Sequence, residues 1–162
     1  MHKFLASGAY GVLSGFQWHA GEWNQAELPL IPSQRGIHVC RIEHLAYWVD
    51  EDLWSVELAG ELVEGEQAVV AERGRLVERL AGWDVAARRA FAEACAARVL
   101  DERFAEDAAE RLGRANPAAE VGYYGAYAAG RLAEVSGASH DEAFAAERAW
   151  QSRWIAARLG LT

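Results

Sequence analysis

Hydrophobic and polar positions follow two different periods in the two halves of this chain. Up to about residue 82, short runs alternate between apolar and polar residues and are divided by glycine and proline, which is typical of strands and turns. The clearest run is DEDLWSVELAGEL, in which Trp54, Val56 and Leu58 share one face. After residues 82–84 the apolar positions recur every three to four residues, which predicts amphipathic helices.

One segment of the first half, RGIHVCRIEHLAYW, combines a strand with a short helix. The alternation places Ile37 and Val39 on one face of the strand, and His38 and Cys40 on the other. The next apolar positions have helical spacing, which predicts a short helix over 42–49. A later segment, QAVVAERGRLVERL, fits either two strands around a central glycine or a helix that begins there, and we favour the strands.

Residues 83–162 predict three alanine-rich helices. The first begins at Asp84 and ends at a stop signal around Gly113. The second is closed by Gly137, and the sequence SHDE that follows has the spacing of a capping box for the third. Gly160 stands where the C-terminal cap of that third helix is expected.

Together these elements predict an α+β protein. Residues 1–82 form a small, mostly antiparallel sheet with one short helix, and residues 83–162 form a three-helix region packed on it. The two parts are either separate domains with this boundary or one single domain. We also expect the apolar stripes of the C-terminal helices to support a homo-oligomer.

The composition argues against several classes of protein. The chain has 162 residues, 52% of them hydrophobic, and two cysteines, which fits a globular protein and not a disulfide scaffold. No apolar run approaches the roughly 18 residues of a membrane span, and the first residues lack an apolar signal segment. We therefore expect a cytoplasmic protein that binds no membrane. The net charge of −8 disfavours nucleic acid, which leaves a protein partner or a small molecule.

Four short segments, SGFQW, RGIHVC, LAYW and LWSVELAGELVEG, follow one another along the chain. This order resembles that of a bacterial protein family, often phage-associated, whose function is not established. The matching residues are Gly15, Phe16, Gln17, Gly36, Ile37, His38, Cys40, Glu57, Gly60 and Glu61. Gln151 matches a glutamine close to the C-terminus of such proteins, whereas Val39 stands where alanine is usual. The resemblance covers roughly residues 3–80 and implies a fold but no mechanism.

His38, Cys40 and His44 form an H-x-C-x3-H pattern, and imidazole and thiolate groups suit zinc. A structural zinc site needs a fourth ligand, and no CxxC or HxxxH pair reinforces this pattern. We therefore predict no metal site and no cofactor, but a buried cysteine beside a hydrogen-bonded histidine. A Cys40 nucleophile activated by a histidine is disfavoured as well, because same-face strand neighbours lie about 6–7 Å apart.

Glu57 is a candidate for acid–base catalysis, because a carboxylate desolvated in a cleft has a raised pKa. The order of an arginine, the GIHVC strand, a short helix and a glutamate-bearing strand resembles ADP-ribosyltransferase-like folds. That resemblance implies that Arg35 or His38 binds NAD and that Glu57 catalyses the reaction. The candidate catalytic residues are therefore His38, Cys40 and Glu57.

The seven tryptophans either line a ligand pocket or seal the seam between the sheet and the helices, and we favour the seam. The candidate ligand-binding residues are Arg35, His44, Trp18, Trp48 and Trp54. For the whole chain we expect a small soluble accessory or interaction domain. The alternative is an enzyme or small-ligand binder that uses the strand face of His38 and Cys40, with Glu57 nearby.

Overall fold

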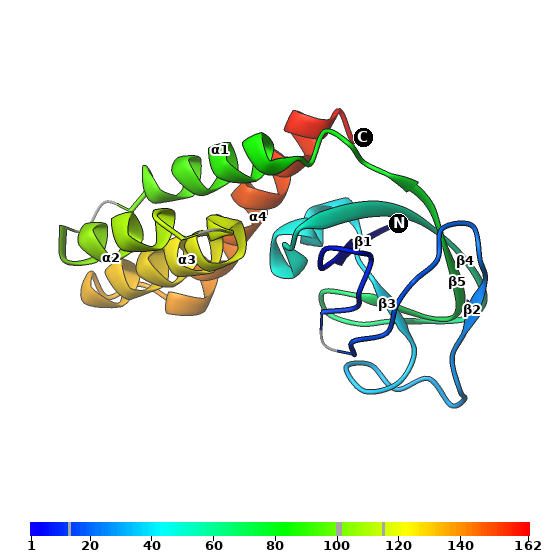
Figure 1. Ribbon diagram of the computed structural model, residues 1–162. Coiled ribbons are helices and arrows are strands. Elements are labelled where there is room, and N and C mark those ends of the chain that lie inside the picture. Colours follow the sequence, from blue (N-terminus) through cyan, green and yellow to red (C-terminus); the bar gives the residue numbers. More distant parts are fainter. Residues whose placement is uncertain (13, 100–101, 115) are drawn as a thin grey trace.

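A long antiparallel hairpin forms the centre of the β-rich half. Its strands are β4 (Asp52–Glu64) and β5 (Val69–Arg79), paired from Trp54 opposite Arg79 to Glu64 opposite Val69. The structure is a computed structural model that describes residues 1–12, 14–99, 102–114 and 116–162 (Figure 1). The alternation predicted for DEDLWSVELAGEL is confirmed, because Leu53 and Val56 are buried in two different cores.

Short strands pair with both edges of this hairpin. β1 (His2–Leu5) pairs with β4, while β2 (Asn24–Gln25) and β3 (Ile37–Val39) pair with successive parts of β5. Every one of these pairs is antiparallel, so the described residues form a five-stranded antiparallel sheet. This confirms the prediction of a small antiparallel sheet in an α+β protein.

The sheet curls until its edges meet (Figure 1). His2 and Cys40 exchange backbone hydrogen bonds of 2.9 and 2.8 Å, which join β1 to the residue that follows β3. Beyond that bridge, Lys3 Nζ donates to the carbonyl of His38 at 2.7 Å and so spans the two strands. The curled sheet encloses an apolar core made of Leu5, Trp18, Ile37, Val39, Val56, Val69, Ala71 and Leu76.

Two elements of the β-rich half can be compared directly with their predictions. The short helix predicted after β3 is η1 (Ile42–Trp48), a 3-10 helix with Leu45 and Ala46 buried. The segment predicted as two strands is instead the single strand β5, which passes through Gly74. A Cβ on Gly74 would lie 3.0 Å from Cγ2 of Ile37, so the missing side chain leaves room for β3 to pack there.

The C-terminal half consists of α1 (Val85–Ala96), α2 (Glu102–Leu112), α3 (Pro117–Val135) and α4 (His140–Leu159). The caps predicted at Ser139 and Gly160 are confirmed, and Asp84 provides a further one. The side chain of Asp84 accepts a hydrogen bond from the N–H of Ala87, and Ser139 accepts one from the N–H of Glu142. Gly160 caps α4 in the left-handed conformation, with a φ of 65°.

The three-helix prediction is corrected in one respect, because its first helix is divided into α1 and α2. α1 ends in a tight turn in which the N–H of Arg98 donates to the carbonyl of Cys95. Both α1 and α2 pack on α3. A single straight helix over the same residues would extend past α3, so the division allows both pieces to bury their apolar faces.

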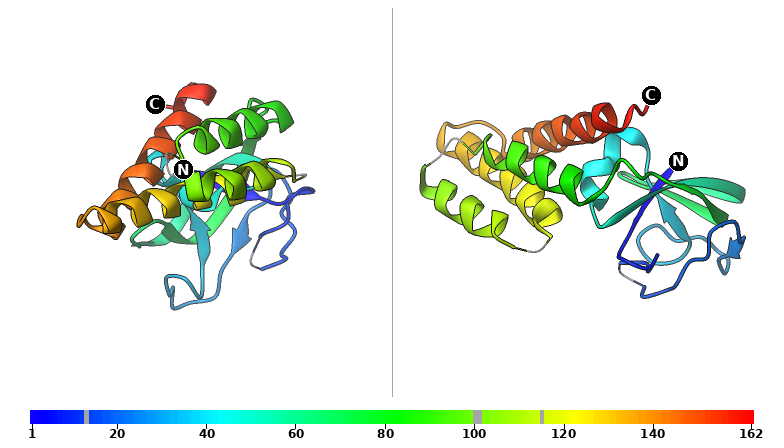
Figure 2. Two further views of the ribbon diagram at one scale, coloured as in Figure 1. Left: turned by 90° about the vertical axis from the view of Figure 1, so that its left-hand side faces the viewer. Right: turned by 45° about the horizontal axis from the view of Figure 1, so that its top comes forward.

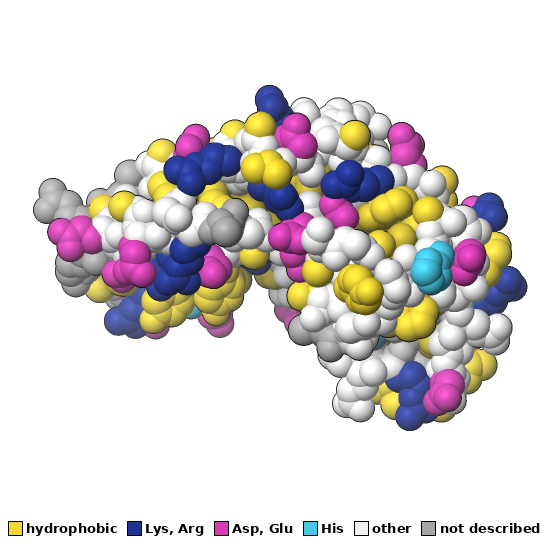
Figure 3. All heavy atoms as spheres, in the orientation of Figure 1, with side chains coloured by type: hydrophobic (Ala, Val, Ile, Leu, Met, Phe, Trp, Pro, Cys, Tyr) yellow, Lys and Arg dark blue, Asp and Glu magenta, His cyan; other side chains and the backbone are white. Residues whose placement is uncertain are grey.

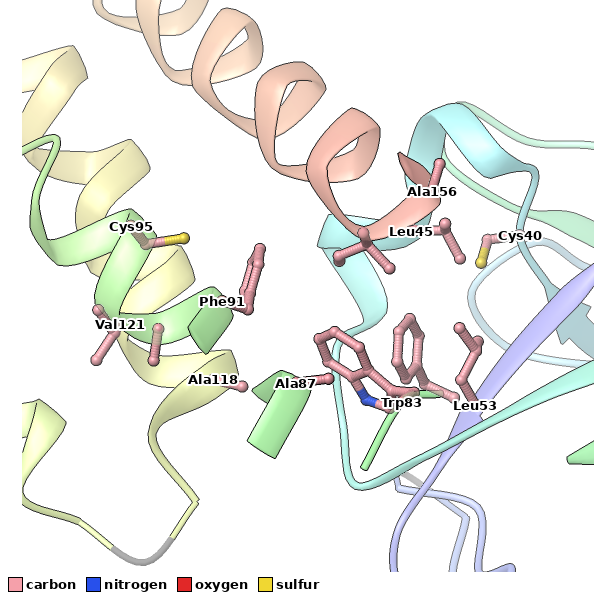
Figure 4. Close-up of a cluster of buried hydrophobic side chains, with 13 residues drawn as sticks. Cys40, Leu45, Leu53, Trp83, Ala87, Phe91, Cys95, Ala118, Val121 and Ala156 are labelled. Atoms are coloured by element: carbon pink, nitrogen blue, oxygen red, sulfur yellow. The ribbon is translucent and has the colours of Figure 1, made fainter. Parts of the chain in front are cut away.

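A second apolar core joins the two halves (Figure 4). Trp83 lies at its centre, with its ring edge-on to Phe4 at 5.7 Å and to Phe91 at 5.8 Å between centroids. Leu45 of η1 and Ala156 of α4 belong to the same core. The helices therefore pack on the β-rich half, and Trp83 lies in the seam between the two halves.

η1 is the part of the β-rich half that α4 contacts most directly. The N–H of Ala46 donates to Oγ of Ser152 at 3.0 Å, and both residues are buried. Figure 2 shows the helices on one side of the curled sheet, with η1 between them and the strands. Among the described residues, no helix is both long enough and apolar enough to span a bilayer.

Candidate functional site

Both ring nitrogens of His38 form hydrogen bonds within its own loop, so neither is available for acid–base catalysis or metal binding. Its Nδ1 lies 3.0 Å from the carbonyl oxygen of Gly36, and its Nε2 accepts the N–H of Ser33 at 3.0 Å. These two bonds define a neutral ring with the proton on Nδ1. Burial lowers the pKa of the His38 imidazole, and the nearby charge of Lys3 lowers it further. The predicted hydrogen-bonded histidine therefore fastens the loop before β3.

Cys40 lies inside the core that joins the two halves, with 1% of its surface exposed. Burial raises the pKa of its thiol to about 12, so the sulfur is protonated and unreactive near neutral pH. Cys95 of α1 is buried too, and burial raises its pKa to about 12. No three His, Cys, Asp or Glu side chains within the described residues are grouped so that they could hold a metal ion.

Glu57 lies on the exposed face of β4, where its carboxylate accepts two hydrogen bonds from Arg75 at 2.9 and 2.6 Å. Arg35 lies in the loop before β3 and donates to the carbonyl of Leu28 at 3.4 Å. Because β5 lies between β3 and β4, the structure separates Arg35 from Glu57. The candidate catalytic residues His38, Cys40 and Glu57 do not converge on one cleft.

The candidate tryptophans are mainly part of the cores. Trp18 is buried under the curled sheet, and Trp54 packs against the same core. Trp48 packs on the core between the halves and donates its Nε1–H to the carbonyl of Gln67 at 2.8 Å. His44, the remaining ligand-binding candidate, is on η1 with its ring edge-on to Tyr47.

The structure instead gathers aromatic rings on α3 and α4, two of them exposed and two half-buried. Tyr123 packs edge-on to Phe144 at 5.7 Å between centroids, His140 stacks on Phe144 at 6.2 Å, and Tyr127 packs edge-on to His140 at 5.8 Å. Tyr123 is 57% exposed and Tyr127 is 39% exposed. We call these four residues the aromatic face. Figure 3 shows hydrophobic side chains gathered along the lower edge of the helical half.

His140 is positioned by a glycine of the neighbouring helix. A Cβ on Gly130 would come within 2.6 Å of the His140 ring, so only glycine lets the ring pack against α3 at this point. An open hollow of about 380 Å³ lies at this end of the aromatic face. It is lined by Tyr127, Arg131, Glu134, Ser139, His140 and Asp141.

Arg148 lies at the other end of the aromatic face, and it is an unusual residue for a helix interior because it is only 5% exposed. Its guanidinium is 5.1 Å from the ring centroid of Tyr47, and 5.9 Å from those of Tyr123 and Phe144. Nη1 donates to Oε1 of Gln151 at 2.9 Å. Nε is buried and finds no hydrogen-bond partner within the described part of the chain. Burial lowers the pKa of this guanidinium.

None of these residues was among the candidates from the sequence, although α4 contains a signal for them. Phe144, Arg148, Gln151 and Ile155 recur at helical spacing on one face, so two polar residues occupy positions where a core-facing helix needs apolar ones. A polar residue at such a position indicates a buried hydrogen-bond network or a binding site. Gln151, the C-terminal glutamine of the family resemblance, belongs to this network.

Comparison with known proteins does not assign this site to a known family. No protein-family model matches the chain, and no curated protein or solved structure is significantly similar to it.

Proposed function

We propose that this protein is a small interaction domain that docks a segment of a partner protein on the aromatic face of α3 and α4. The observation behind the proposal is the run of ring contacts from Tyr127 to Phe144, together with the exposure of Tyr123 and Tyr127. Tyrosine, phenylalanine and arginine are enriched at the centres of protein interfaces, where their rings exclude water.

The arrangement of the other candidates favours binding over catalysis. An enzyme needs its acid, base or nucleophile within hydrogen-bonding reach of one bound substrate. Cys40 is buried, both ring nitrogens of His38 are occupied, and Glu57 is paired with Arg75 on the sheet surface.

Selection of peptides on the full chain tests this proposal. A displayed library of random linear peptides is selected on the wild-type protein, and each selected peptide is then measured against the Tyr123→Ala/Tyr127→Ala variant. We expect the double substitution to weaken binding by at least about tenfold, because it removes two rings from the face. Circular dichroism checks that the variant is folded, as expected for two exposed positions.

The matched control is Leu62→Ala/Val77→Ala, which removes two exposed apolar side chains from the sheet. We expect this variant to bind the selected peptides as the wild type does. The proposal fails if no peptide is selected, or if the tyrosine and control variants bind the selected peptides equally well.

A further inference from the structure

The guanidinium of Arg148 is fixed in place by a chain of buried hydrogen bonds. Nη1 donates to Oε1 of Gln151, and Nε2 of the same glutamine donates to the carbonyl of Gly122 at 2.8 Å. Gln151 has no exposed surface, so this amide cannot turn toward solvent. The hydrogen bond to Gln151 uses Nη1 and therefore does not satisfy Nε, on the other side of the guanidinium.

The neighbouring charges on α4 differ in their partners. Glu147 accepts a fork of two hydrogen bonds from Arg98, each of 2.8 Å, and is thereby neutralised. Arg148 has no salt bridge to any described residue and is surrounded by the rings of Tyr47, Tyr123 and Phe144. Contacts with rings recover part of the free energy of burying a cation, but they satisfy no N–H donor.

The side of a guanidinium formed by Nε and Nη2 fits a planar carboxylate, whose two oxygens accept two parallel hydrogen bonds, and in Arg148 the Nε–H on that side has no partner among the described residues. A phosphate dianion usually needs several cationic or backbone donors, whereas the Arg148 guanidinium is surrounded mainly by the rings of Tyr47, Tyr123 and Phe144. The rings also suit the hydrophobic residues that flank an acidic side chain in a peptide.

We propose that Arg148 binds the carboxylate of an aspartate or glutamate side chain in the docked partner segment. This inference rests on the proposed function, since the carboxylate arrives with a segment that covers the aromatic face. Tyr123 is the most exposed ring around the guanidinium, so we expect a segment docked on the aromatic face to reach Arg148 by displacing the Tyr123 side chain.

The test uses two small probes that differ only in charge. The full-length protein is titrated with 3-phenylpropionate and, separately, with 3-phenylpropanamide, while the Nε–H resonance of Arg148 is followed by ¹H–¹⁵N NMR. The resonance is assigned by its loss in Arg148→Lys. We expect the carboxylate to shift this resonance and the amide to leave it in place. Inorganic phosphate is the third probe, and we expect it to cause no comparable shift.

Two variants distinguish a bidentate hydrogen bond to the carboxylate from an effect of charge alone and from an effect of packing. Arg148→Lys keeps the charge and removes the fork, and Arg148→Met removes both, so each is expected to weaken binding of 3-phenylpropionate at least about tenfold. Arg153→Lys, on the exposed side of the same helix, is the matched control and is expected to change nothing. Thermal unfolding confirms that all three variants fold.

The outcomes distinguish this inference from the proposed function. If both probes shift the aromatic face equally, or if selected peptides bind there without any carboxylate, the inference is overturned while the interaction domain stands. An equal response to phosphate overturns the choice of a carboxylate. If no probe moves the Arg148 resonance, no carboxylate is bound there, whereas the peptide selection decides the function independently.

Discussion

The strand that contains His38 and Cys40 and the helix that contains Arg148 present opposite solutions to the burial of polar groups. Around the strand, each ring nitrogen of His38 has a backbone partner, and the thiol of Cys40 lies protonated in an apolar core. On the helix, Arg148 is buried with its charge unpaired and its Nε unsatisfied within the described residues. Reactive residue types therefore serve the fold in one region, while an ordinary charged residue is left available in the other.

This difference indicates that a buried polar group without a hydrogen-bond partner is a better guide to a binding site than the presence of histidine or cysteine. A buried polar group with all its partners in place stabilises the native state. A buried cation without an acceptor destabilises it, and proteins retain such groups where a ligand completes them. Substitutions in each region can break or sharpen this contrast.

The largest effect is expected from Cys40→Ser. The substitution places a hydroxyl in an apolar core beside Phe4 and Leu53, where it finds no acceptor, so the free energy of unfolding should fall by about 2 kcal/mol. Urea unfolding measures the change, with Cys40→Ala as the control for lost volume. Peptide binding on the aromatic face should persist. A serine variant as stable as the alanine variant would show that Cys40 is not in an apolar environment.

A smaller, pH-dependent loss is expected around His38. Because its folded pKa lies below 6.5, the unfolded chain takes up a proton first as the pH falls, so stability should decline below about pH 6.5. Protonation of Nε2 also removes the acceptor for Ser33. His2 contributes with the same sign, since burial lowers its pKa as well.

Urea unfolding at pH 7.5 and at pH 5.5 measures this loss. His38→Gln retains an acceptor for Ser33 but does not titrate, so its decline with pH should be shallower than that of the wild type. Identical declines in the two proteins would mean that His38 contributes nothing to the pH dependence, and that His2 accounts for it.

The smallest effect is expected from Arg148→Met, although it replaces a buried charge. The variant loses ring contacts and the Gln151 bond but no longer buries an unsatisfied N–H group, so stability should change by less than about 1 kcal/mol. Gln151→Leu is the comparison, because it leaves Nη1 of Arg148 without its acceptor and removes one hydrogen bond to the Gly122 carbonyl, which should cost about 1.5 kcal/mol. A large loss in Arg148→Met would mark Arg148 as structural.

Much of the fold could be predicted from the sequence, because the signals that define it are local. The alternation in β4, the helical spacing after β3 and the caps at Asp84, Ser139 and Gly160 depend on neighbouring residues. The division between α1 and α2 could not be predicted in this way. Their apolar stripes are nearly in phase, and only the length of α3 against which both pack requires a break.

The candidate site was harder to predict than the fold. A sequence pattern identifies residues by chemical type, which favours His38, Cys40 and Glu57. It contains no information on which residues contact them in the folded protein. The cage around Arg148 combines Tyr47 of η1 with residues of α3 and α4 that lie far along the chain. The polar positions of α4 signalled a buried network, but its unpaired donor became visible only in three dimensions.

The core around Trp83 is shared by the two halves of the molecule. It draws Phe4 and Leu53 from the β-rich half together with Phe91 and Ile155 from the helices, so removing either half exposes one side of the other, while the core inside the curled sheet remains. The two halves are therefore coupled through shared packing, and we expect a destabilising change in one half to lower the stability of the other. Because η1 contributes Leu45 to this core and Tyr47 to the rings around Arg148, we expect a ligand bound at Arg148 to raise the melting temperature of the whole protein and not of the helices alone.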